Sequence, residues 1–86
     1  MALVLGAQVG DAFLIGRRRI VVKAVYSPDQ VKLERDDGAM HTVGPHQWNE
    51  VFHDVFIRTG PKPAKGYVRL QFEAPQTVLI VRDTPT

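Results

Sequence analysis

The sequence predicts an all-β domain, a small twisted sheet or barrel of about six to seven strands with an inserted hairpin, and it leaves one short helix open as an alternative. Short segments rich in valine and isoleucine recur along the chain, and Gly, Pro or Asp turn signals separate them. One Asp-Gly pair between two such segments is a strong hairpin signal. With 86 residues, the chain is expected to be a single domain, 1–86, whose small core leaves little surplus stability.

The first third of the chain predicts three strands. Ala2–Leu5 and Ala12–Ile15 are apolar segments, and Val9–Asp11 between them has the composition of a turn. Ile20–Tyr26 is rich in β-branched residues, which favour strands, and Pro28 ends it.

The middle of the chain predicts a hairpin that turns at Asp37 and Gly38. Val31–Arg35 alternates apolar and polar residues as a half-buried strand does, so Gln30–Asp36 and Ala39–Val43 are expected to be the two strands. A type I′ turn needs positive φ at both central positions, which Asp tolerates and Gly accepts freely.

Pro45 can begin a short helix that places Trp48, Val51 and Phe52 on one face. Val51–Ile57 is also prone to form a strand, so both alternatives stay open at this point.

The last third predicts strands at Val55–Arg58, Tyr67–Glu73 and Val78–Arg82. The glycine- and proline-rich segment Gly60–Gly66 is expected to be a loop.

The net charge is +2, but the charges are unevenly placed. Basic residues dominate Arg17–Arg35 and Arg58–Arg69, whereas Asp36–Ile57 contains no lysine or arginine. Such a distribution predicts a surface with two poles, and a basic patch attracts polyanions such as nucleic acids. The alternative is a set of solvated strand faces without a partner.

The residues that catalysis or metal binding requires are missing. The chain has no cysteine, and the spacings between His41, His46 and His53 do not match the i, i+4 pair of a helical metal site. Ser27 is the only serine, and no glycine cluster matches a phosphate-binding loop. We therefore expect no enzyme, no metal, no cofactor and no small-molecule substrate. The apolar runs are too short to cross a membrane and no secretion signal is visible, so a cytoplasmic location is expected.

Both ends of the chain resemble the carbon storage regulator (CsrA/RsmA) family of bacterial RNA-binding translational regulators. The stretch Leu3–Gly16 aligns without a gap to the opening of that family, a Leu-Val-Leu strand, a Gly-acid turn and an apolar strand ending in Ile-Gly. The stretch Val68–Asp83 aligns without a gap to its fourth and fifth strands, with the Ala-Pro corner and the arginine that ends the last strand.

The middle of the chain departs from the usual family member. We interpret residues 17–53 as an insertion between the second and third family strands, as in RsmN-like members, with Asp54–Gly60 as the third strand. The alternative takes Arg19–Tyr26 as the third strand and places the insertion after it. The resemblance implies an intertwined, strand-exchanged homodimer in which Leu3–Leu5 pairs with Val78–Arg82 of the partner.

The resemblance also implies the function, which is the recognition of GGA-type sequences in single-stranded or hairpin loops of an mRNA leader or a small regulatory RNA. Arg82 occupies the position of the principal RNA-contacting arginine. The other family contact positions are occupied by Leu5, Gly6, Ala74, Pro75, Val78 and Ile80.

One departure weakens the match at the site, because Gly6, Ala7 and Gln8 replace the family's Thr-Arg-Lys. The cations of Arg17, Arg18 and Arg19 would compensate if the insertion folds back over the site. The alternative function is a protein-interaction module that keeps the fold, has lost RNA binding, and docks on or mixes with another regulator.

Overall fold

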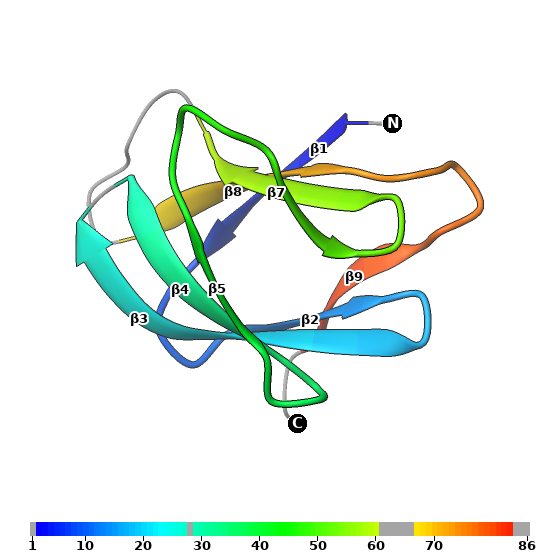
Figure 1. The fold of residues 1–86 in the computed structure, drawn as a ribbon, viewed down its shortest axis with the longest axis horizontal. Coiled ribbons are helices and arrows are strands. Elements are labelled where there is room, and N and C mark those ends of the chain that lie inside the picture. Colours follow the sequence, from blue (N-terminus) through cyan, green and yellow to red (C-terminus); the bar gives the residue numbers. More distant parts are fainter. Residues whose placement is uncertain (1, 28, 61–66, 84–86) are drawn as a thin grey trace.

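The structure is a computed structural model that describes residues 2–27, 29–60 and 67–83. These residues form nine strands in two antiparallel sheets, which face one another as two layers (Figure 1). The described part of the chain contains no helix that is long and apolar enough to cross a membrane. The all-β fold class predicted from the sequence is confirmed.

The two sheets have simple antiparallel orders. One sheet has the order β1-β8-β7-β6, and the other has the order β5-β4-β3-β2-β9. The strands are β1 (Ala2–Ala7), β2 (Ala12–Ile15), β3 (Arg18–Ser27), β4 (Gln30–Arg35), β5 (Met40–Val43), β6 (Asn49–Phe52), β7 (Val55–Thr59), β8 (Val68–Glu73) and β9 (Ile80–Asp83).

The core fills the space between the two sheets. Alternate residues of a strand point to one face, and on β8 the residues Val68, Leu70 and Phe72 are buried there. Phe13 of β2 meets Phe72 edge to face, with ring centroids 5.5 Å apart. Because β2 and β8 belong to different sheets, this aromatic pair joins the two layers at the centre of the core.

The prediction of a short helix after Pro45 is wrong. Asn49–Phe52 is strand β6, which pairs with β7 through a turn at His53 and Asp54. Asp54 has a φ of 59°, a left-handed conformation that aspartate tolerates better than most residues. The strand preference of the Val51–Ile57 segment therefore outweighs the helical spacing of its apolar side chains. With β6, the strands in the described part of the chain number nine rather than the expected six to seven.

The predicted β4–β5 hairpin is present, but its turn is of another type. Gly38 has a φ of 88°, whereas Asp37 has no positive φ, which excludes a type I′ turn. The amide of Gly38 donates to the carbonyl of Arg35 (3.0 Å), and the amide of Arg35 donates to the carbonyl of Ala39 (2.8 Å). This pattern is a three-residue loop in which a left-handed glycine follows a tight turn.

The hairpin also packs into the core, whereas a surface insertion would project from it. Val31 and Leu33 of β4 and Val43 of β5 are fully buried between the sheets. β4 pairs with both β3 and β5, so the hairpin supplies two strands of the five-stranded sheet. The expected loop at Gly60–Gly66 lies, from Pro61 on, outside the described residues.

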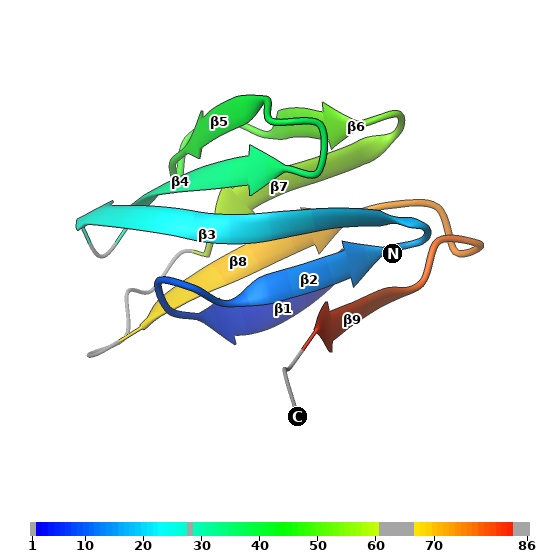
Figure 2. The same ribbon diagram turned by 90° about the horizontal axis from the view of Figure 1, so that it is seen from below.

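Two edge strands face one another across an opening between the sheets. β1 is the edge of one sheet, β9 is the edge of the other, and they run in the same direction (Figure 2). Within the chain, β1 pairs with β8 and β9 pairs with β2. We call this opening the β1–β9 seam; it runs from Leu3 and Val78 at one end to Gly6 and Arg82 at the other.

The turn geometry predicts the effect of Gly38→Val. A Cβ at this position would meet nothing within 4 Å, so only the positive φ opposes the substitution. We expect the free energy of unfolding to fall by about 1–2 kcal/mol, because a β-branched residue resists this conformation. Urea unfolding measures the change, and Gly38→Asn, which tolerates the left-handed region, should cost clearly less. Equal stability of the valine variant and the parent would show that the turn has another conformation.

Candidate nucleic-acid interface

Arg82 bridges the two sheets at one end of the seam. It stands opposite Phe13 in the β2–β9 register, so its side chain leaves the sheet on the face that carries the core. The guanidinium carbon lies 5.2 Å from the centroid of the Phe13 ring. From there Nη2 donates to the carbonyl of Gly6 on β1, and Nη1 lies 3.1 Å from Oδ2 of Asp11. The side chain stays about a third exposed, at 36%.

These contacts assign Arg82 a structural role besides any binding role. A charge that points inward from an edge strand hinders pairing with an unrelated strand, and this one also covers the rim of the core. Asp11 offsets its charge and is itself fixed, because the Asp11 carboxylate accepts a hydrogen bond from the amide of Gln8 (2.9 Å). A ligand at this end meets a nearly neutral ion pair rather than a free cation.

The other end of the seam is an apolar hollow of about 290 Å³. Leu3 of β1 lines it together with the segment that joins β8 to β9. Val78 and Ile80 pack partly against the core, Ala74 is buried, and Pro75 is exposed. Leu5 lies on β1 between the two ends and also packs partly against the core.

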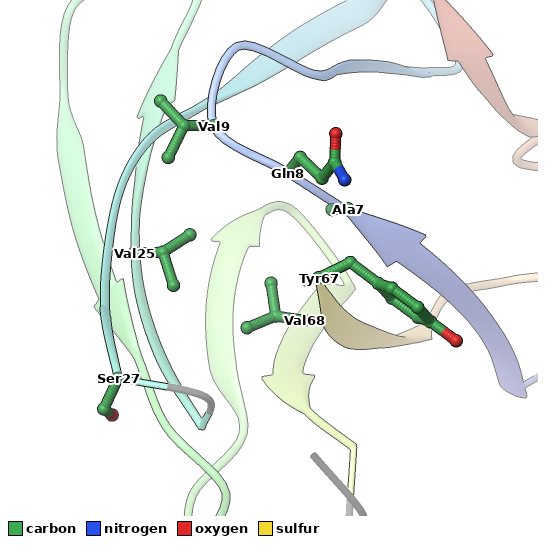
Figure 3. Close-up of a pocket in the computed structure, with 7 residues that line it drawn as sticks. All are labelled: Ala7, Gln8, Val9, Val25, Ser27, Tyr67 and Val68. Carbon is green, nitrogen blue, oxygen red and sulfur yellow. The ribbon is translucent and has the colours of Figure 1, made fainter. Parts of the chain in front are cut away.

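Beside Gly6 the seam is covered by an aromatic ring. A Cβ placed on Gly6 would lie 2.9 Å from Cδ2 of Tyr67, so the ring rests against the backbone where other residues carry a side chain. Figure 3 shows that this ring extends along β1, and the ring lines one hollow together with Val25 and Val68. That hollow has a volume of about 460 Å³ and is mostly apolar. A second hollow, of about 260 Å³, contains Gly6, Asp11, Tyr67 and Arg82.

Only part of the arginine run lies beside the seam. Arg17 is exposed in the β2–β3 turn, next to Gly16, whose amide donates to the carbonyl of Leu79 (2.8 Å). Arg19 forms an ion pair with Asp83 of β9 at 2.8 Å. Arg18 binds Asp36 at 2.8 Å, and its guanidinium lies 4.4 Å from the centroid of the Phe52 ring on β6. Since β6 is the opposite edge of the sheet from β1, Arg18 points away from the seam.

A cluster of charges and one aromatic ring closes the opposite end of the sandwich. Arg18 and Arg35 both lie over Phe52, and Arg35 also donates to the carbonyl of Val51 (3.0 Å). Hydrogen bonding from Arg18 lowers the pKa of Asp36 below its usual range, with help from the amide of Arg19. Hydrogen bonding from Arg35, and then from the amide of Ala39, lowers the pKa of Asp37. The same pairing with Asp36 raises the pKa of Arg18.

The expected two-pole charge distribution is therefore only partly present. Much of the first basic stretch is paired with carboxylates, and Lys23 adds a further pair with Glu34 at 3.5 Å. In the second stretch, Arg58 stacks on Trp48 on the outer face of the four-stranded sheet, with its guanidinium carbon 4.4 Å from the ring centroid.

One group of potential metal ligands occurs in the part of the chain that the structure describes. Glu50, His53 and Asp54 have donor atoms within 4.8 Å of one another, and all three are exposed at the β6–β7 turn. The carboxylate of Glu50 accepts a hydrogen bond from the amide of Asp54 (3.0 Å), so turn geometry accounts for their proximity.

The structure thus brings seven of the predicted residues to the seam within one chain. They are Leu5, Gly6, Ala74, Pro75, Val78, Ile80 and Arg82. Sequence reasoning missed Asp11, which pairs with Arg82, and Tyr67, which covers Gly6. A glycine within β1 was the one available signal for the contact with Tyr67. Without a side chain at Gly6, a neighbouring ring can lie on the strand.

Comparisons with known proteins add no relative. No protein-family model matches the sequence, and neither a curated protein nor a solved structure matches it.

The Arg18–Asp36 pair predicts acid sensitivity. A carboxylate with a lowered pKa binds fewer protons in the folded chain than in the unfolded chain, so its stabilising effect is complete above the unfolded pKa and is lost as the pH falls through the folded pKa. We expect Asp36→Asn to be less stable than the parent at pH 7, with the difference shrinking below about pH 4. Urea unfolding at several pH values measures this. The exposed Asp54→Asn is the matched control, and a parent–variant difference for Asp36→Asn that is constant from pH 7 to pH 3 would contradict the prediction.

Proposed function

We propose that this protein is an RNA-binding post-transcriptional regulator that recognises GGA-type sequences in single-stranded or hairpin loops. Its RNA would be an mRNA leader or a small regulatory RNA in the cytoplasm, and it would act without catalysis or a cofactor. The site is the β1–β9 seam. A loop of RNA suits such a site because its bases are unstacked and expose their edges to backbone and side-chain groups.

One observation carries the proposal. Residues far apart in the sequence, which the family resemblance assigns to one RNA site, line the same seam, and Arg82 contacts Gly6 there directly. Both strands of the seam are edges, so the backbone groups on their outer sides are not paired with another strand of the described chain. The guanidinium is a planar fork, which suits a guanine edge or a phosphate.

A second observation favours the alternative, a protein-interaction module on the same fold. The Thr-Arg-Lys cations of the resemblance are absent, and Asp11 neutralises the remaining arginine. Unpaired strand edges also accept strands from other proteins. Measurements of RNA binding separate these two functions.

The first functional prediction concerns Arg82→Ala. We expect this substitution to weaken binding of a GGA hairpin by about 1–3 kcal/mol, the range for one good bidentate contact. Titration by fluorescence anisotropy against a GGA loop and a scrambled loop measures the loss. Because Arg82 also joins the sheets, thermal unfolding of the variant must show that it is folded at the temperature of the titration.

Two matched arginines serve as controls for this substitution. Arg58→Ala removes an arginine that also lies over an aromatic ring, but on the outer face of the other sheet, and should bind RNA as the parent does. Arg17→Ala should weaken both RNAs alike and reduce the salt slope by about 0.7, the value for one phosphate of a single strand. The RNA-binding proposal fails if the parent does not prefer the GGA loop, and the assignment of Arg82 fails if Arg82→Ala binds as the parent does.

The homodimer stays a prediction, and the edge strands suggest how it would form. β1 and β9 run in the same direction, so a two-fold axis across the seam sets β1 antiparallel to β9 of the partner. Each site would then combine β1 of one chain with β9 of the other. We expect sedimentation equilibrium to give twice the chain mass of 9.6 kDa. A monomer at all concentrations would exclude the dimer and leave the seam of one chain as the site.

A further inference from the structure

We infer that Tyr67 is a stacking platform for one unpaired base of the RNA bound at the seam, an inference that rests on the proposed function. The position of the ring carries the argument. Tyr67 immediately precedes β8, yet its ring lies against Gly6 of β1, on the edge strand of the sheet (Figure 3). It is 40% exposed, so part of an aromatic ring faces the solvent.

The absence of a side chain at Gly6 makes this arrangement possible. A Cβ there would approach Cδ2 of Tyr67 to 2.9 Å and Cε2 to 3.1 Å, distances at which the ring has to move. Gly6 also has no positive φ, so turn geometry does not require glycine at this position. The glycine instead allows the close approach of the ring, which takes the place of the first-strand side chain that the family resemblance leads one to expect.

The surroundings of the ring suit a base better than a phosphate. The hollow of about 260 Å³ beside Tyr67 also contains Arg82 and Asp11, whose charges offset one another. Attraction of the phosphate backbone is therefore weak at this end of the seam. An aromatic ring supplies binding free energy of another kind, because every base has a face that stacks on it.

The ring and the arginine then have separate tasks in one site. Arg82 reaches Gly6 from β9, and Tyr67 lies on Gly6 from the start of β8, so both side chains meet at one residue of β1. A base that stacks on the ring has a planar donor group within the same hollow. This arrangement favours a single-stranded loop, whose bases can leave the stack, over a duplex.

Fluorescence of 2-aminopurine tests the inference, because stacking on an aromatic ring quenches it. Three hairpin RNAs are needed, each with 2-aminopurine at one position of the GGA loop, and they are titrated with the parent, Tyr67→Phe and Tyr67→Leu. We expect at least one probe to be quenched by the parent and by Tyr67→Phe. Tyr67→Leu should abolish that quenching and lower the affinity roughly tenfold, as expected for the loss of one stacked base.

Two further variants make the result specific. Tyr26→Leu removes the only other tyrosine, which is more exposed and lines none of the hollows of the seam, and should bind as the parent does. Gly6→Ala keeps Tyr67 but pushes its ring aside, and should reduce quenching and affinity. This variant decides the question if Tyr67→Leu does not fold.

The outcomes separate the inference from the proposed function. If Tyr67→Leu, or Gly6→Ala in its place, binds and quenches as the parent does while Arg82→Ala loses affinity, Tyr67 is not a platform and the RNA site stands. If the parent does not bind the GGA hairpins, the proposed function fails, and the inference fails with it.

Discussion

Arg82 connects the two sheets on the side of the sandwich where the edge strands β1 and β9 are not paired. It leaves β9 on the face that carries the core, lies over Phe13 and donates to the carbonyl of Gly6 on β1. The sheets themselves do not close there, because β1 and β9 are edge strands that are not paired with one another in a backbone ladder. One guanidinium therefore connects the two edge strands where backbone pairing is missing. The hollows along the seam lie where the two strands are not paired.

The opposite end of the sandwich is closed by the same kind of interaction. Arg18 and Arg35 lie over Phe52, and Asp36 and Asp37 hold their guanidinium groups in place. Arginine is suited to both ends, since its planar group can stack on a ring and donate several hydrogen bonds at once. Much of the basic charge of the described residues is thus paired within the fold, so a count of basic residues overstates the charge that is free to meet a ligand.

The extent to which the sequence predicts the structure differs between local and non-local features. Ala12–Ile15 was predicted with the bounds of β2, because periodicity and flanking turn residues are properties of the segment itself. The segment around Phe52 was ambiguous, and pairing with β7 decided it in favour of a strand. The turn type predicted for Asp37-Gly38 was wrong. The Asp37 carboxylate accepts a hydrogen bond from the amide of Ala39, and the dipeptide Asp-Gly does not reveal this contact. Likewise, nothing near Tyr67 in the sequence shows that it covers Gly6, because that contact depends on how β1 pairs with β8.

The proposal that RNA binds along the β1–β9 seam is tested most directly by amide chemical shifts of the isotope-labelled protein. A titration with the GGA hairpin should move the amide signals of Leu3–Gly6 and of Val78–Arg82, with those of β5 and β6 unchanged. These two strands are the edges farthest from the seam within their own sheets, so they are an internal control. Shifts that cluster on β5 and β6 instead, or an absence of shifts at saturating RNA, would contradict the account.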